Sequence, residues 1–407
     1  MNNIWHPYTK MKDFEIDPPI FIERAEGLKL FDNQGNFYYD TISSWWCNIH
    51  GHNHPKIVAA INEQLTKLDH VLFAGFTHEN AILLAEKLIE ITPKHITKVF
   101  YSDNGSTAVE IALKMSLQYW NLTDKPKKTK FVALDRGYHG DTVGAMSVSS
   151  VGRFNDVFKP LLFESFKAKT PYRISDSEAL ESFDSILKNH HEEIAAFIVE
   201  PLLMGAGGMI MYSTAYLEKA AELCKKYEIH LIVDEVATGF GRTGKMFAID
   251  HTKQNVKPDF MCISKGITSG TLPLAATLTT DDVYSVFEEH IFYHGHTYTA
   301  NPIACAAAVA ALQIFEDEDT LNKIQPRIEQ LRVGLKNLKV PFRQLGMVVA
   351  IELPEGLSEK IYQLGLREHL ILRPIGNVVY LYLPLCVKEE ELAFILEKTV
   401  GIVESIL

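Results

Sequence analysis

An acidic pair and a lysine follow two short apolar stretches of this chain. Asp234 and Glu235 end the run Ile-His-Leu-Ile-Val-Asp-Glu-Val at 229–236, and Lys265 follows the apolar run 260–263. Both runs have the composition of buried strands, and side chains at the carboxyl ends of parallel strands face the place where α/β proteins bind ligands. A fixed negative charge beside an amine suits pyridoxal phosphate, which needs a carboxylate for its ring nitrogen and a lysine for its aldehyde.

Two further segments offer partners for such a cofactor. Residues 99–113 predict a strand, a turn and a helix start, where the backbone N–H groups of Gly105 and Ser106 would bind a phosphate. The alternative is an ordinary N-cap, which uses the same residue types. In Gly-Tyr-His-Gly-Asp at 137–141, Tyr138 would lie flat on an aromatic ring. The alternative is a glycine-rich turn with an ordinary surface tyrosine.

Other patterns point to different chemistry. Residues 239–244 spell the dinucleotide fingerprint G-x-G-x-x-G, but no amphipathic helix follows the last glycine. Histidines that might indicate a metal stand at 50, 52, 54, 294 and 296, but a glycine and a proline interrupt the first group. We therefore expect neither a nucleotide site nor a metal site. Glu200 ends another apolar run, where it would either face a ligand or cap the next loop.

The elements that must position these residues alternate along the chain. Helical periodicity occurs at 56–69, 78–92, 106–120, 215–227, 300–316, 319–337 and 389–406. Short apolar strands are expected at 97–101, 130–134, 195–199, 229–234, 260–264 and 274–279. This alternation predicts an α/β domain around a mostly parallel sheet. The apolar run 303–315 is too short to span a membrane and predicts a buried helix.

The two ends of the chain have a different pattern. Residues 29–39 predict a hairpin with Asp-Asn-Gln-Gly as its turn. Strand candidates near the C-terminal end lie at 346–352 and 377–383. We predict a large domain at 46–305 and a smaller α+β domain built from 1–45 and 306–407.

Composition narrows the range of partners. A formal net charge of −11 over 407 residues disfavours nonspecific binding to nucleic acid or to anionic membranes. The first ten residues lack the basic-then-apolar pattern of a signal peptide. The five cysteines include no C-x-x-C pair, which fits a reducing compartment. We expect a cytoplasmic protein with no nucleic-acid or membrane partner.

Together these segments resemble the class III pyridoxal-phosphate aminotransferases of fold type I, over nearly the whole chain. Asp234-Glu235 and Ser264-Lys265-Gly266 form the core signature. The resemblance implies an α/β large domain with a mostly parallel seven-stranded sheet and a homodimer with shared active sites. It also implies ping-pong amino transfer between small molecules, with Lys265 as the catalytic amine and Asp234 as the partner of the ring nitrogen.

Finer motifs are similar to those of the members that aminate 8-amino-7-oxononanoate in biotin biosynthesis. These motifs are Trp5-His-Pro-Tyr-Thr9, Ser43-Ser-Trp-Trp46, His50-Gly51, His294-Gly-His-Thr-Tyr-Thr-Ala-Asn301 and Leu372-Arg-Pro-Ile-Gly376. By this resemblance, the cofactor contacts are Gly105, Ser106, Tyr138, His296 and Thr297, with Thr297 reaching in from the partner. The substrate contacts are Tyr8, Trp45, Tyr138, Arg373 for the carboxylate, and Gly295 from the partner. Without the resemblance, Trp45 would be a core aromatic residue and Arg373 a surface ion-pair partner.

The resemblance leaves the amino donor open. Most of these members use S-adenosylmethionine, and a minority use lysine. Many have proline where this chain has His296, and the pair His296-Thr297 is nearer to the His-Ser form of lysine users. Two other functions remain alternatives: another class III ω-amino acid transaminase, and a non-catalytic protein of the same fold. The presence of both Asp234 and Lys265 disfavours the second.

Overall fold

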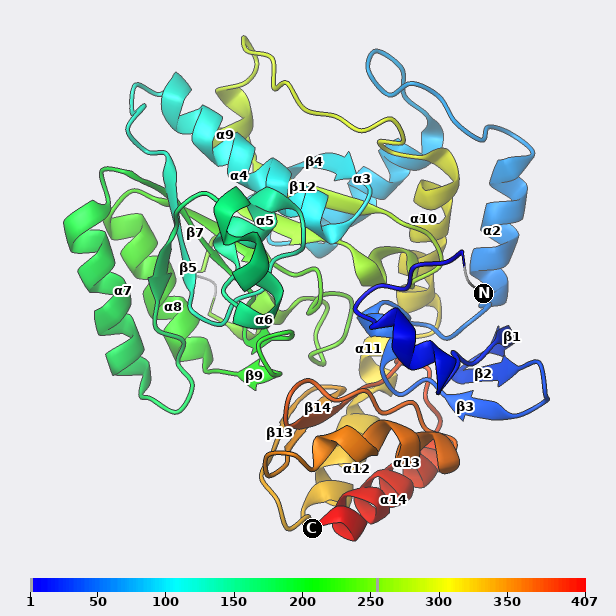
Figure 1. The fold of residues 1–407 in the computed structure, drawn as a ribbon. Coiled ribbons are helices and arrows are strands. Elements are labelled where there is room, and N and C mark those ends of the chain that lie inside the picture. The colour runs from blue at the N-terminus through cyan, green and yellow to red at the C-terminus, as the bar shows by residue number, and fades with distance from the viewer. Residues whose placement is uncertain (1–2, 254–255) are drawn as a thin grey trace.

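The computed structural model describes residues 3–253 and 256–407. At its centre lies a seven-stranded sheet with the order β4-β12-β11-β10-β7-β5-β6 (Figure 1). Its strands are β4 (Ile96–Ser102), β5 (Lys130–Leu134), β6 (Phe166–Ala168), β7 (Ile194–Val199), β10 (His230–Asp234), β11 (Phe260–Ile263) and β12 (Ala275–Thr280). Only β12 is antiparallel to its neighbours. The mostly parallel, seven-stranded sheet is thereby confirmed.

Helices cover both faces of this sheet, which is why its strands are continuous apolar runs. Every residue of β7 is buried. Phe131 and Ile198 belong to the cluster that contains α4 (Gly105–Leu122). The residues next to them in sequence, on the same two strands, belong to a second cluster that contains α7 (Asp176–His190) and α8 (Thr214–Lys226). Successive side chains thus serve opposite faces.

Most predicted helices are present. They are α2 (Pro55–Leu65), α3 (Glu79–Ile91), α4, α8, α10 (Pro302–Asp317) and α14 (Glu389–Ile406). The helix expected at 319–337 is divided into α11 (Thr320–Lys323) and α12 (Gln325–Leu335), because Pro326 has no N–H to continue the first helix. Five helices were not predicted from the sequence: α7 and the short helices α5 (Val143–Val148), α6 (Gly152–Asn155), α9 (Asp281–Ser285) and α13 (Ile361–Arg367).

Two small antiparallel sheets come from the N-terminal and C-terminal parts of the chain, which both lie in the lower part of Figure 1. One contains β1 (Ile22–Glu26), β2 (Lys29–Asp32) and β3 (Phe37–Tyr39), and the other β13 (Phe342–Leu345), β14 (Val348–Glu352) and β15 (Val378–Tyr382). A two-stranded ribbon is formed by β8 (Leu203–Met204) and β9 (Ile210–Met211).

Backbone hydrogen bonds join the two ends of the chain. The Tyr39 N–H donates to the His369 carbonyl over 2.7 Å, and the Ile371 N–H donates to the Tyr39 carbonyl over 3.0 Å. The joining of both ends follows the expected architecture. The division at 46–305 stays a prediction, and α10 runs without interruption through residue 305.

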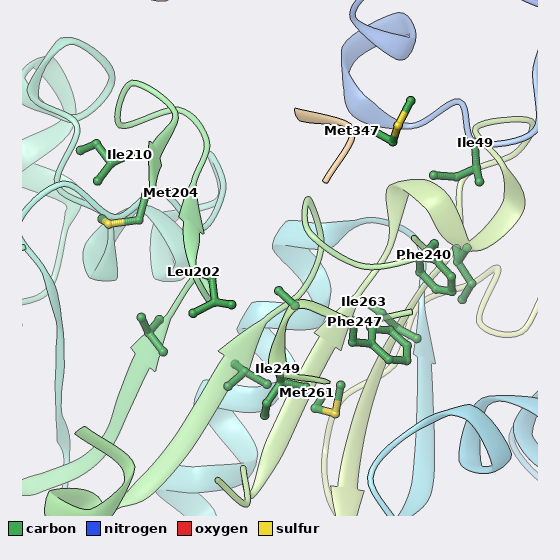
Figure 2. Close-up of a cluster of buried hydrophobic side chains, with 14 of the residues drawn as sticks. Ile49, Leu202, Met204, Ile210, Phe240, Phe247, Ile249, Met261, Ile263 and Met347 are labelled. Atoms are coloured by element: carbon green, nitrogen blue, oxygen red, sulfur yellow. The ribbon is translucent and has the colours of Figure 1, made fainter. Parts of the chain in front are cut away.

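The core reaches up to the ends of the central strands. Figure 2 shows Phe240, Phe247 and Ile263 in one buried cluster. The two phenylalanine rings meet edge to face, with centroids 5.6 Å apart. Burying one such side chain contributes roughly 1.5–3 kcal/mol. Because Ile263 ends β11, this packing fixes the chain just before Lys265.

The apolar run 303–315 lies within α10, most of whose residues are buried. It therefore forms the predicted buried helix. Within residues 3–253 and 256–407, no helix combines the length and apolar character needed to cross a membrane.

Candidate active site

Two cavities meet at Lys265. The first has a volume of about 470 Å³ and is lined by Asp234, Gly105 and Ser106 among others. The second has a volume of about 750 Å³ and extends away toward the small sheets. The residues common to both are Trp46, Cys47, Tyr138 and Lys265. A group bound in the first cavity would thus meet a molecule in the second at the lysine.

Asp234 ends β10 and is held in place from two sides. Its Oδ1 accepts the Val236 N–H over 3.1 Å, and its Oδ2 lies 2.8 Å from the Nδ1 of His139. The His139 side chain is almost completely buried, and its Nε2 has no hydrogen-bond partner among residues 3–253 and 256–407. No role for His139 was predicted from the sequence, although it stands in the Gly-Tyr-His-Gly motif. Its ring fixes the orientation of the carboxylate that faces the first cavity.

Lys265 occupies a strained backbone position at the end of β11. Its φ is +44°, in the left-handed region, and it begins the 3₁₀ turn η4 (Lys265–Thr268). Such conformations persist at functional sites where the surrounding structure over-determines them. Its Nζ lies 5.1 Å from the centre of the Trp46 ring. Burial lowers the pKa of Lys265, while the charges of Asp234 and Glu200 raise it.

The lowered pKa of Lys265 leads to a testable pH dependence. In cofactor-free protein, the midpoint of reductive methylation against pH should lie lower for Lys265 than for an exposed lysine such as Lys257, because only the neutral amine reacts. Asp234→Asn should move the midpoint lower still, since it removes a charge that raises this pKa. Peptide mass spectrometry across a pH series measures both. A midpoint that stays equal to that of Lys257 would contradict the burial effect.

The N-terminus of α4 forms one wall of the first cavity. Asn104 accepts the Thr107 N–H over 3.1 Å, and the Thr107 side chain completes the capping box. Asn104 is therefore the N-cap. The N–H groups of Gly105 and Ser106 belong to the first turn, where they have no partners inside the helix, and phosphate binding by them stays a prediction.

Close packing around this wall explains why glycines stand at positions 105 and 140. It also bears on whether the backbone can approach a phosphate. A Cβ on Gly105 would lie 2.6 Å from the Cγ1 of Val236. A Cβ on Gly140 would lie 2.0 Å from the Oγ of Ser106. The backbone thus comes closer than any side chain would allow, as phosphate cradles require.

Glu200 has both of the roles considered from the sequence: it faces a cavity, and it caps a loop. It lines the first cavity, and its two oxygens accept the N–H groups of Tyr138 and Gly205 over 3.0 and 2.9 Å. Burial and the charge of Asp234 raise the pKa of Glu200 to about 8, against these two hydrogen bonds. The carboxyl group fastens the Tyr138 loop to the end of β7, so the tyrosine ring faces both cavities.

The second cavity brings together residues from distant parts of the chain. The Tyr8 and Trp45 ring centres lie 5.4 Å apart, and the Tyr8 hydroxyl donates to Asp141. The guanidinium of Arg373 lies 4.8 Å from the centre of the Trp45 ring. Trp45 is 40% exposed, so it is a wall of the cavity and not a core aromatic residue. Within residues 3–253 and 256–407, Arg373 forms no ion pair.

The turn α1 (Ser43–Trp46) carries both tryptophans and is left-handed throughout, with φ values of 52°, 46°, 77° and 72°. Each left-handed residue costs roughly 1–2 kcal/mol, so other contacts must hold the turn. Arg242 is fully buried beside it and donates to the Ser43 hydroxyl and to the carbonyls of Trp46, Asn48 and Leu383. Burial lowers the pKa of Arg242 to about 10.

Three predicted residues line neither cavity in this chain. Gly295 and Thr297 are exposed, and His296 Nδ1 lies 3.8 Å from the Oδ2 of Asp103, a residue that lines the first cavity. Their segment is fastened to α4, because Lys114 contacts the carbonyl of Tyr293. Among the described residues of one chain, none of the three lines either cavity. Their contact with a partner's site stays a prediction.

The glycine pattern at 239–244 and two of the histidines have structural roles that need neither a nucleotide nor a metal. A Cβ on Gly241 would meet Leu385 at 2.5 Å, and one on Gly244 would meet Ile328 at 3.0 Å. These glycines therefore allow the loop to pack against the C-terminal part of the chain. His50 and His52 bind the carbonyl of Ala311 and the carboxylate of Asp40. The described ranges contain no cluster of three potential metal ligands.

A sequence model of the family described as Aminotransferase class-III matches residues 12–403. The chain belongs to this family. It is 44% identical to an adenosylmethionine-8-amino-7-oxononanoate aminotransferase of Methanocaldococcus jannaschii, over 96% of this chain and 94% of the relative. It is 46% identical to the enzyme of the same name from Anoxybacillus flavithermus, over 96% of this chain and 92% of the relative. The sequence resemblance is thereby confirmed.

Solved structures of class III aminotransferases share this fold. The crystal structure of the Methanocaldococcus jannaschii enzyme superposes with a TM-score of 0.95 and covers 99% of this chain and 97% of its own. An omega transaminase from Pseudomonas jessenii in complex with PMP, 31% identical, superposes with a TM-score of 0.94 and covers 100% of this chain and 96% of its own. The fold type I architecture is confirmed. As a class III aminotransferase, the protein is a pyridoxal-phosphate-dependent enzyme.

Proposed function

We propose that this class III aminotransferase converts 8-amino-7-oxononanoate to 7,8-diaminononanoate in biotin biosynthesis. The names of the relatives at 41–46% identity support this substrate. The structural observation that carries the proposal is the second cavity, which runs from Lys265 along aromatic walls to the Arg373 guanidinium. A long apolar chain with one terminal carboxylate matches this arrangement.

The residues of the first cavity suit pyridoxal phosphate. Gly105 and Ser106 would hold its phosphate, Asp234 would pair with its ring nitrogen, and Tyr138 would cover its ring. When bound, the cofactor supplies an aldehyde for the donor amine and a ring that accepts electrons. The carboxylate of Asp234, oriented by His139 at 2.8 Å, keeps a negative charge at the ring end of the cavity.

Lys265 is the proposed proton carrier. Its Nζ lies where the two cavities meet, so it reaches both the cofactor site and the substrate site. Since burial lowers the pKa of this amine, the neutral form that removes a proton from the substrate carbon is more populated at neutral pH. The same nitrogen then returns the proton. Because both substrates use one site, ping-pong kinetics are expected.

Arg373→Ala should weaken binding of the keto substrate roughly ten- to hundredfold, because a charge-assisted hydrogen bond contributes about 1.5–3 kcal/mol. The donor half-reaction should change less, because of the two substrates only the keto substrate is proposed to reach Arg373 with its long chain. Single-turnover absorbance measures each half-reaction separately.

Arg373→Lys provides the matched control, because it keeps the charge and loses the planar fork. It should fall between the wild type and the alanine variant. An equal loss of rate in both half-reactions of Arg373→Ala would show that Arg373 has a structural role or binds both substrates.

The amino donor is proposed to be S-adenosylmethionine, after the names of the relatives, with lysine as the alternative. The alternative rests on the His296-Thr297 pair. A half-reaction assay with the two donors in parallel, followed by addition of 8-amino-7-oxononanoate, tests donor and function together. Conversion with neither donor would contradict the proposed function.

A second candidate function is that of another ω-amino acid transaminase. It is supported by solved omega transaminases that superpose at a TM-score of 0.94 with 30–31% identity. A panel of aliphatic ω-amines as donors and short keto acids as acceptors distinguishes the two. Faster turnover of the panel than of 8-amino-7-oxononanoate would favour this second function.

We also propose a homodimer in which Gly295 and Thr297 complete the partner's site. Both residues are exposed, and neither lines a cavity of its own chain, which supports the proposal. Mixing Lys265→Ala with an inactive Thr297 variant should restore up to about a quarter of the wild-type activity, because half of the randomly mixed dimers contain one intact site. An active monomer in sedimentation would contradict the shared site.

A further inference from the structure

The left-handed turn α1 (Ser43–Trp46) is held by a carboxylate that lies outside both cavities. Asp40 is 1% exposed. Its Oδ1 accepts the Ser44 N–H over 2.8 Å, and its Oδ2 accepts the Ser44 hydroxyl over 2.6 Å. The Nε2 of His52 lies 2.9 Å from the same Oδ2. Asp40 thus binds both hydrogen-bond donors of one residue inside the turn.

The backbone of Asp40 is itself fixed. It directly follows β3, and its N–H donates to the Leu28 carbonyl over 2.8 Å, while its carbonyl accepts the Ser43 N–H. The carboxylate therefore has a set position relative to the small N-terminal sheet. The turn is anchored to this sheet on one side and to Arg242 on the other.

The turn determines where the Trp46 ring lies. This ring stacks on Tyr382 with centroids 5.5 Å apart, and its Nε1 donates to the Tyr380 hydroxyl over 3.2 Å. Behind it, a Cβ on Gly205 would lie 2.9 Å from the ring. The indole can shift in none of these directions, and it lies 5.1 Å from the Lys265 amine.

Trp45, the preceding residue of the turn, lies against a different cation, the Arg373 guanidinium at 4.8 Å. One left-handed turn therefore directs two adjacent indoles to the two ends of the second cavity. In a right-handed turn, the same two side chains would leave the backbone in other directions, and both contacts would be lost.

We propose that Asp40 is a positioning residue for the reaction proposed above. It acts through Ser44 to keep the turn left-handed, and so sets Trp45 against Arg373 and Trp46 against Lys265. Without its carboxylate, the Ser44 N–H loses its acceptor and the Ser44 hydroxyl keeps only the Nε2 of His52 at 3.5 Å, so the strained turn relaxes. This inference rests on the proposed function only for its consequences in turnover, because the orientation of the two indoles can be measured without substrate.

The test compares three variants by near-ultraviolet circular dichroism, which reports immobilised tryptophan rings, and by KM and kcat. Asp40→Ala should lose much of the tryptophan signal and raise KM for the keto substrate at least tenfold. Asp40→Asn keeps one acceptor for the Ser44 N–H and should be intermediate. Asp40→Ala with Ser44→Gly should regain signal and affinity, because glycine adopts positive φ without steric cost.

Asp32→Ala is the matched control. Asp32 is also a buried carboxylate of the N-terminal sheet, and it accepts the N–H groups of Gln34 and Asn36, away from the turn. Its loss should lower the melting temperature without changing the tryptophan signal or KM.

Two results would overturn the role of Asp40: an unchanged tryptophan signal and KM in folded Asp40→Ala, or no recovery in the glycine double variant. If Asp40→Ala does not fold, Asp40→Asn decides by the same readouts. A wild-type enzyme that does not aminate 8-amino-7-oxononanoate would refute the proposed function instead, and the dichroism comparison would still judge Asp40.

Discussion

Lys265→Ala is expected to lower turnover by at least about a thousandfold while the protein still binds its cofactor. The variant removes both the amine that binds the cofactor aldehyde and the group that moves the substrate proton; proton transfer by a positioned side chain alone contributes about 10²–10⁴-fold. The contacts proposed for the phosphate and the ring, at Gly105 and Asp234, remain. Steady-state assay and absorbance of the purified protein with added cofactor measure the two effects.

Lys245→Ala supplies the control for a lysine near the site. Its Nζ donates to the Asp250 carbonyl in the loop between β10 and β11, outside both cavities. This variant should keep wild-type turnover. Normal transamination by Lys265→Ala would refute the assignment of Lys265 and with it the position of the reaction.

Asp234→Asn is expected to lower turnover by about 10²–10³-fold, or about 3–4 kcal/mol, the range typical of one preorganised electrostatic group. The amide has the same shape and keeps an oxygen for the Val236 N–H, so the melting temperature should change far less than the rate. The reason is the loss of negative charge at the ring end of the cavity. Pre-steady-state rates with saturating cofactor measure the effect.

Asp259→Asn is the matched comparison. Asp259 is half-buried beside the same strands at their opposite end, where it accepts the Leu231 N–H, and desolvation raises its pKa to about 6. Its amide variant should change stability without lowering turnover at full cofactor occupancy. Turnover of Asp234→Asn close to that of Asp259→Asn would contradict the electrostatic role.

The central sheet could be predicted because parallel strands buried on both faces are continuous apolar runs. The edge strand β6 (Phe166–Ala168) could not, because three residues with a lysine at the centre carry no periodicity. The helix α7 was missed although Ser175 caps it and its buried residues, Ala179, Phe183 and Leu187, recur every four positions. That pattern was present in the sequence and could have been used.

The residues of the candidate site also fall into two groups, those that local sequence predicts and those that it does not. Asp234 and Lys265 could be found because the first ends its strand and the second lies two residues past the end of its strand, so local sequence places both at the edge of the sheet. His139 could not be assigned from local sequence, because it acts through a hydrogen bond to Asp234 in another segment. Asp40 binds the nearby Ser44, but the left-handed turn that it holds is a conformation that local propensity disfavours. No local pattern states which distant group a buried polar side chain will meet.

By itself, the sequence determined the α/β class, an acid and a lysine at the ends of two strands, and the helix start at Gly105, because each follows from residue types at short spacing. Only the tertiary structure decided that His139 orients Asp234, that Glu200 fastens the Tyr138 loop and that a left-handed turn directs two tryptophans to two cations. These features depend on contacts between distant segments and on a backbone conformation that local propensity disfavours. Such a conformation is held only when the contacts of the complete fold outweigh its steric cost.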